Sequence, residues 1–181
     1  MNTEQIEQLF LHRQSCREFT NKPVPDELVE KVCRLALLAP SACNSQPWKL
    51  IAVTGEKTKE VAKGLQDMGM NKFVSDAPVL VAIVEAKGNL TATVGSRFKH
   101  NDFLHNDIGI LTAHLVLAAD AAGLGSCIIG WRNEEKLRPV LGLDEKARIP
   151  QVVALGYPPE DYPIRPKKRK PVEESFTFLK D

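Results

Sequence analysis

The sequence has no long apolar run and almost no net charge. Its longest apolar stretch, 77–84, has eight residues and includes Pro78, whereas a membrane helix needs roughly 20. The N-terminal residues are polar and include Glu4, so no signal peptide is predicted. With 24 basic and 23 acidic residues, the net charge of +1 provides no overall field for nucleic acid or membrane. We therefore expect a cytoplasmic protein that binds neither.

Cysteine is scarce, and the histidines show no metal-binding spacing. The four cysteines could form two disulfides, but without a secretory signal we expect reduced thiols. No C-x-x-C, H-E-x-x-H or G-x-S-x-G motif occurs, and no general base pairs with Cys43 or Cys127. The sequence therefore predicts neither a metal site nor a catalytic side-chain nucleophile. The four cysteines are Cys16, Cys33, Cys43 and Cys127, and the four histidines are His12, His100, His105 and His114.

Two glycine patterns resemble phosphate-binding motifs but are incomplete. Gly125 and Gly130 have the spacing of a P-loop, but Trp131 and Arg132 occupy the places of its Lys and Ser/Thr. The pair 123–125 follows an expected helix rather than a strand, unlike a dinucleotide-binding turn. We interpret these glycines as a helix stop and a tight turn.

The length of 181 residues fits a single domain over 1–181. Apolar spacing predicts helices over 3–13, capped by Thr3, then 25–39, 56–68, 101–122 and 133–142. It predicts strands over 48–54, 79–84, 126–129 and 151–155. The stretch 86–100 is polar and without periodicity, which indicates a loop. Five of the twelve prolines lie after Tyr157, so residues 157–181 are expected to form an extended C-terminal arm.

The run 165–170, RPKKRK, is the strongest basic cluster. As a nucleic-acid patch it lacks interleaved aromatic residues and a basic helix beside it. As a solvated tail it needs no function. A third interpretation is a clamp for one small phosphate, formed together with Arg13 and Arg17.

Four segments together resemble the nitroreductase family of FMN-dependent oxidoreductases. They are RQSCREF at 13–19, APSACNSQPW at 39–48, a helix with DIG at 107–109 that ends in AGLGSC at 122–127, and ALGYP at 154–158 with the basic stretch after it. Their order and spacing over about residues 10–175 make the match specific. The resemblance implies an α+β fold with a mostly antiparallel central sheet flanked by helices. It also implies a homodimer with exchanged C-terminal arms.

The resemblance implies a binding site for the FMN phosphate. It places Arg13 on the phosphate, with Lys167 and Arg169 reaching it from the arm. Gln14 lies in the same motif, and the Ser15 hydroxyl is expected to donate a hydrogen bond to the ribityl chain or the phosphate. Arginine and lysine suit this role because a phosphate dianion binds charged donors best.

The resemblance also implies which residues lie near the flavin ring. Arg17 falls where the family has a cation near N1 and C2=O, and such a cation raises the reduction potential of the flavin. A salt-bridged surface arginine is the alternative. Ile129 and Gly130 match the segment whose backbone faces the N5 edge, with the Ile129 N–H as the expected donor.

The resemblance also makes the site span two subunits. A loop that reaches the partner's flavin in the family corresponds here to Pro40, Ser41, Ala42 and Asn44. The stretch 68–74 matches the family poorly where an Asn/Lys pair is expected, which leaves Asn71 and Lys72 as candidates.

The activity implied is hydride transfer from NAD(P)H through FMN to an electron-poor acceptor such as a nitroaromatic or a quinone. No side chain is expected to be catalytic, because the flavin carries the chemistry. An FMN-binding sensor or storage module without turnover is the alternative. A phosphate- or RNA-binding protein without flavin is a third class.

Overall fold

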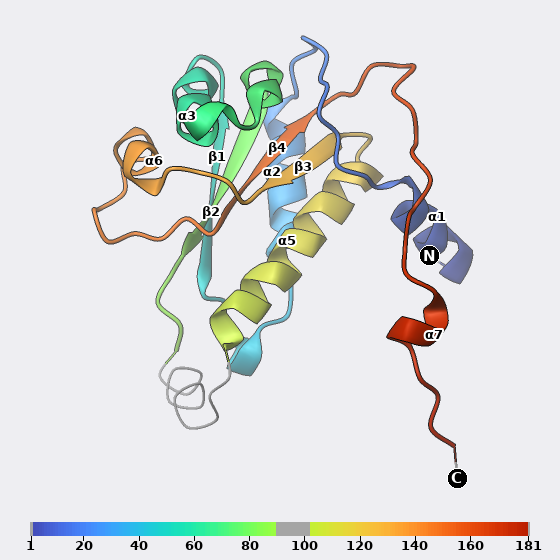
Figure 1. Ribbon diagram of the computed structural model, residues 1–181. Coiled ribbons are helices and arrows are strands. Elements are labelled where there is room, and N and C mark those ends of the chain that lie inside the picture. The colour runs from blue at the N-terminus through green and yellow to red at the C-terminus, as the bar shows by residue number, and fades with distance from the viewer. Residues whose placement is uncertain (1, 90–101, 181) are drawn as a thin grey trace.

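The structure, a computed structural model, describes residues 2–89 and 102–180. Four strands form one antiparallel sheet in the order β1-β2-β4-β3 (Figure 1). They are β1 Trp48–Thr54, β2 Val79–Glu85, β3 Gly125–Ile129 and β4 Gln151–Gly156. The expected α+β class with an antiparallel sheet is confirmed, and each strand was predicted to within one residue of its bounds.

The described residues form six α-helices; five were predicted, each with wider bounds than the structure has, and the one in the C-terminal arm was not predicted. They are α1 Thr3–His12, α2 Asp26–Ala36, α3 Lys57–Leu65, α5 Phe103–Ala121, α6 Glu134–Val140 and the short α7 Val172–Ser175. Asn2, and not Thr3, caps α1, because the Asn2 side chain accepts the Gln5 N–H at 3.0 Å. Helix α2 ends before 39 because the residue preceding a proline avoids helical geometry. Helix α3 ends early because Met68 and Gly69 have positive φ.

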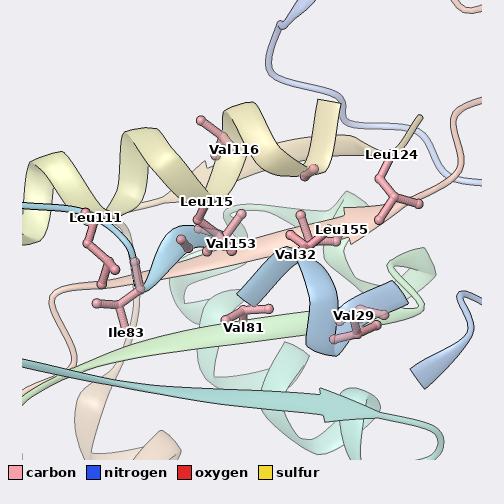
Figure 2. Close-up of a cluster of buried hydrophobic side chains, with 14 of the residues drawn as sticks. Val29, Val32, Val81, Ile83, Leu111, Leu115, Val116, Leu124, Val153 and Leu155 are labelled. Atoms are coloured by element: carbon pink, nitrogen blue, oxygen red, sulfur yellow. The ribbon is translucent and has the colours of Figure 1, made fainter. Parts of the chain in front are cut away.

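The two central strands are buried on both faces. Alternate residues of β2 and β4 face opposite layers, with α2 and α5 on one side and α3 and α6 on the other. Figure 2 shows the first layer, where Leu115 of α5 lies against Val153 of β4 and Leu111 lies beside Ile83 of β2. This double coverage explains why β2 consists of apolar residues throughout.

After β4 the described chain contains no further strand, and α7 is its one short helix. This arm passes close to α1 before it leaves the body of the protein (Figure 1). None of the described helices is long and apolar enough to cross a membrane. Most of the expected loop 86–100 and His100 lie outside the described residues.

Candidate functional site

The N-terminal motif lies along the outer edge of β3. The Cys16 N–H donates to the Ser126 carbonyl at 2.8 Å, and Ser15 forms a parallel bridge with Ser126. A Cβ at Gly125 would lie 2.7 Å from Cys16 Sγ, so only glycine allows this approach. Gly125, interpreted from the sequence as part of a turn, therefore allows the motif at 13–19 to pack against the edge of the sheet.

The C-terminal arm crosses the same motif. The Gln14 side-chain nitrogen donates to the Pro163 carbonyl at 2.8 Å, and its oxygen accepts the Arg165 N–H at 3.2 Å. The Arg165 guanidinium donates to the Ser15 carbonyl at 2.5 Å and to Gln14 Oε1 at 3.0 Å. The Gln14 side chain, a predicted cofactor contact, is thus engaged with the arm.

A hollow of about 480 Å³ opens where the motif and the arm meet. It is lined by Arg13, Gln14, Ser15, Arg165, Pro166, Lys167, Lys168 and Arg169. Lys167 Nζ donates to the Arg13 carbonyl at 2.6 Å. Burial lowers the pKa of Lys167, and the nearby charges of Arg13 and Arg169 lower it further, although Asp120 opposes them. The structure therefore brings the predicted phosphate cations into one hollow rich in positive charge.

Arg17 lies farther along the motif. Its side chain is exposed, and its backbone N–H donates to the Tyr162 hydroxyl at 3.1 Å. Within the described part of the chain, no carboxylate lies within ion-pair distance of Arg17. The guanidinium acts on Cys127 of β3, whose pKa is raised by burial and partly lowered by Arg17. The cation thus lies beside β3 and is not used in a surface salt bridge.

The strand register shows which β3 amides face outward. Successive residues of a strand direct their backbone groups to opposite edges. Ser126 directs its carbonyl outward to Cys16, so Ile129, three residues on, directs its N–H inward to its partner Val152. Ile128 and Gly130 direct their amides outward, and that of Gly130, just after the end of β3, has no hydrogen-bond partner among the described residues. The geometry therefore favours Gly130 over Ile129 as the free donor.

The turn after β3 is held by an ionic network. Arg132 Nη1 donates to the Gly130 carbonyl at 2.6 Å, and Arg132 Nη2 pairs with Glu134 at 3.0 Å. Glu134 also pairs with Arg138 and Arg148, each at 3.0 Å. Burial raises the pKa of Glu134, but the hydrogen bonds that it accepts outweigh burial and the pKa lies below its ordinary value. Sequence patterns had not indicated this network.

The loop after α2 has strained backbone. Cys43, Asn44 and Gln46 have φ of 52°, 50° and 46°, a region that non-glycine residues rarely adopt. Ser41 Oγ accepts the Gln46 N–H at 2.9 Å. Strain of this kind persists only where surrounding contacts fix the backbone, and it is concentrated at functional sites.

Asp107 fixes the start of that loop. It lies in the second turn of α5, is 4% exposed, and accepts the Ala42 N–H. Pro40, Ser41, Ala42 and Asn44 therefore lie near the start of α5, whereas Asp120, which acts on Lys167, lies near its end (Figure 1). At about 1.5 Å per residue, these two positions on the helix are about 20 Å apart. The structure thus separates this loop from the phosphate hollow of the same chain.

The two candidates at 71 and 72 lie in different environments, one bound to the backbone and the other exposed. Asn71 has φ 52°, and its side chain donates to the carbonyls of Leu65 and Trp131, each at 3.1 Å. Lys72 is exposed. Asn71 therefore joins the 66–71 segment to the residue after Gly130.

The cysteines are free thiols, and burial raises the pKa of three of them. Cys33 reaches about 11, and the pKa values of Cys16 and Cys127 are also raised. Raised pKa values disfavour the thiolate, which is the nucleophilic form. No cluster of three or more His, Cys, Asp or Glu able to hold a metal occurs within 2–89 and 102–180.

Comparisons with known proteins identify the family and the fold. The sequence profile of the Nitroreductase family matches residues 11–157. An NADH dehydrogenase of Thermus thermophilus is 30% identical, with 90% of either chain covered. The crystal structure of a nitroreductase family protein from Streptococcus pneumoniae is 28% identical with a TM-score of 0.81, covering 96% of this chain and all of that one. An FMN-dependent nitroreductase from Clostridium difficile is 22% identical with a TM-score of 0.71, covering 96% of this chain and 98% of that one.

Proposed function

Because the chain belongs to the nitroreductase family of NAD(P)H-dependent oxidoreductases, we propose that it binds FMN and transfers hydride from NAD(P)H to an electron-poor acceptor such as a nitroaromatic or a quinone. The observation that carries the proposal is the positive hollow at the edge of β3, next to a line of outward-facing backbone groups. When bound, FMN supplies the two-electron chemistry at N5. The protein supplies binding, orientation and electrostatics.

The hollow fits a phosphate monoester. Arg13, Lys167 and Arg169 bring three cations to a space of about 480 Å³, and the lowered pKa of Lys167 reflects their mutual repulsion as well as burial. A dianion placed there would offset this repulsion and accept charge-assisted hydrogen bonds. The Ser15 side chain lines the same space and would donate to the phosphate or to the ribityl chain.

The ring would lie farther along the β3 edge. Its N5 side would accept a hydrogen bond from a backbone N–H, and that of Gly130, which has no partner among the described residues, would provide it. Arg17 would provide the cation near N1 and C2=O, where it would stabilise the negative charge of the reduced ring. The Arg132 guanidinium, which binds the Gly130 carbonyl, would hold that peptide in place. No side chain of this chain needs to act as an acid or a base.

A homodimer would complete the site. Loop 40–44 lies about 20 Å along α5 from the hollow of its own chain, and is therefore better placed for a partner's flavin. Phe176, Phe178 and Leu179 of the arm are 60%, 69% and 90% exposed, which is costly for an isolated chain. Strand β1 pairs only with β2 among the described residues, and a groove lined by α2 and β1 runs beside it. These features suit arms exchanged between two copies.

The alternative is a flavin sensor or storage protein without turnover. The two functions share the hollow and differ in access to the ring. The purified protein should be yellow with an FMN spectrum, and NADH or NADPH should bleach it under anaerobic conditions. A nitroaromatic or a quinone should then restore the colour.

Two other results would contradict the proposal. A protein that binds FMN but is not reduced by either nicotinamide would be a sensor or storage module. A colourless protein that takes up no added FMN would exclude flavin binding altogether. Sedimentation of the loaded protein tests the dimer, which a stable monomer with full flavin occupancy would disprove.

A further inference from the structure

Gln14 connects two segments that are far apart in the sequence. Its side-chain oxygen accepts both the N–H and Nε of Arg165, at 3.2 and 3.0 Å, and its nitrogen donates to the Pro163 carbonyl at 2.8 Å. An amide oxygen has two acceptor sites, and the arm uses both of them. Gln14 therefore holds the arm, and its oxygen is not available to a cofactor.

The docked arm brings like charges together. Lys167 lies against the Arg13 carbonyl, and Arg165 and Arg169 line the same hollow. Asp120 acts on Lys167 as the opposing carboxylate, and it also pairs with His12 at 2.9 Å. Repulsion among cations in a partly buried space opposes docking, because the local dielectric is lower than that of water. The Gln14 hydrogen bonds act against this repulsion.

We propose that Gln14 is a positioning residue, and that docking of the arm onto it is coupled to occupation of the hollow by a phosphate group. An anion in the hollow would offset the repulsion that opposes docking. By linkage, the factor by which the anion favours docking is also the factor by which docking raises the affinity of the hollow for the anion, so a contact that holds the arm docked strengthens anion binding. The inference rests on the proposed function only in taking that phosphate to be part of FMN.

The coupling can be measured without catalysis. Hydrogen exchange of the arm amides, above all that of Arg165, would be followed in flavin-free protein with and without inorganic phosphate. Inorganic phosphate should slow this exchange, and FMN should slow it by at least about tenfold. Riboflavin, which lacks the phosphate, should leave it unchanged.

The variant Gln14→Met tests the role of the side chain, because methionine keeps its length and removes both polar ends. It should abolish the effect of phosphate on arm exchange and weaken FMN binding by at least about tenfold, with riboflavin affinity unchanged. Gln8→Met, at an exposed position of α1, is the matched control and should behave as the parent protein. Arg165→Met should act like Gln14→Met, and the double variant should be little worse than either single variant.

Two results would overturn the inference. One is arm exchange that is equally slow with and without phosphate. The other is a folded Gln14→Met protein that loses FMN and riboflavin affinity to the same extent, as a merely structural role would require. A protein that shows phosphate-dependent exchange but binds no FMN would keep the coupling and disprove the proposed function, so the two can fail separately.

Discussion

Both carboxylate oxygens of Asp107 accept the backbone N–H of Ala42, at 3.0 and 3.2 Å, across 65 residues of sequence. The carboxylate is buried in the second turn of α5. Ala42 directly precedes the part of the loop in which Cys43, Asn44 and Gln46 have positive φ. A buried anion thus holds one end of a strained loop.

We expect Asp107→Leu to release this loop. Losing the acceptor leaves the Ala42 N–H unpaired, which should destabilise the fold by about 1–3 kcal/mol. If the loop contacts a partner's flavin, FMN affinity should fall in the same variant. Asp107→Asn keeps a side-chain oxygen and is the control. Thermal unfolding and flavin titration would measure both effects, and a Leu variant with unchanged stability and affinity would contradict this role.

The assignment of the N5 donor leads to a matched pair of variants. A Cβ at Gly130 would meet no atom within 4 Å, so Gly130→Ala should retain both the fold and flavin reduction. Gly130→Pro removes the N–H and should slow reduction and lower the flavin potential. Stopped-flow reduction and a redox titration would measure this. A folded proline variant with parental values would return the role to another amide, such as that of Ile129, for which Ile129→Pro is the corresponding test.

The hollow should distinguish FMN from riboflavin. Each charge-assisted hydrogen bond to phosphate contributes about 1.5–3 kcal/mol, so Lys167→Ala with Arg169→Ala should weaken FMN binding by roughly a hundred- to ten-thousandfold. Riboflavin binding should hardly change, and the salt dependence of FMN binding should flatten. Lys57→Ala with Lys63→Ala removes the same charge from exposed positions of α3 and is the control. Equal affinity of the parent protein for FMN and riboflavin would rule out the clamp.

Glu134 should make stability depend on acid pH. Its pKa is lower in the folded protein than its ordinary 4.5, so the ionised group stabilises the fold above that pH. This contribution is lost as the pH falls through the lowered value. Glu134→Gln leaves three arginines without their carboxylate and should cost about 2–4 kcal/mol at neutral pH.

The difference in stability between the parent protein and Glu134→Gln should therefore shrink as the pH falls below 4.5 and through the lowered pKa of Glu134. Urea unfolding across this range would measure it. The exposed neighbour provides a control, because Glu135→Gln makes the same chemical change outside the network. A difference that stays constant with pH would show that the carboxylate charge is not the cause.

The strands could be predicted from the sequence because their signals, apolar runs and bordering glycines, lie in neighbouring residues. Strand β2 is apolar throughout because both of its faces are covered, and glycine borders β1 and β3. The gathering of Arg13 with Lys167 and Arg169 was expected from the family resemblance, and the structure places all three in one hollow.

The partners of the site residues could not be predicted in this way. Asp107 stood inside a recognised motif, but nothing in its spacing pointed to Ala42. Gln14 was predicted to contact the cofactor, and nothing in the sequence indicated that its side-chain amide binds the arm. The choice between Ile129 and Gly130 depends on which edge of β3 faces outward, and that is known only once Cys16 is placed on Ser126. These are long-range relationships, and periodicity reports only local ones.

The arm contacts also determine when the hollow can form during folding. Arg165 reaches Ser15 and Gln14 across 150 and 151 residues, and Lys167 reaches Arg13 across 154. Contacts of such separation form late, because most of the intervening chain must already be ordered before the ends meet. The hollow is consequently one of the last parts of the fold to be completed, and a variant cut before Lys167 would lack three of the residues that line it, Lys167, Lys168 and Arg169.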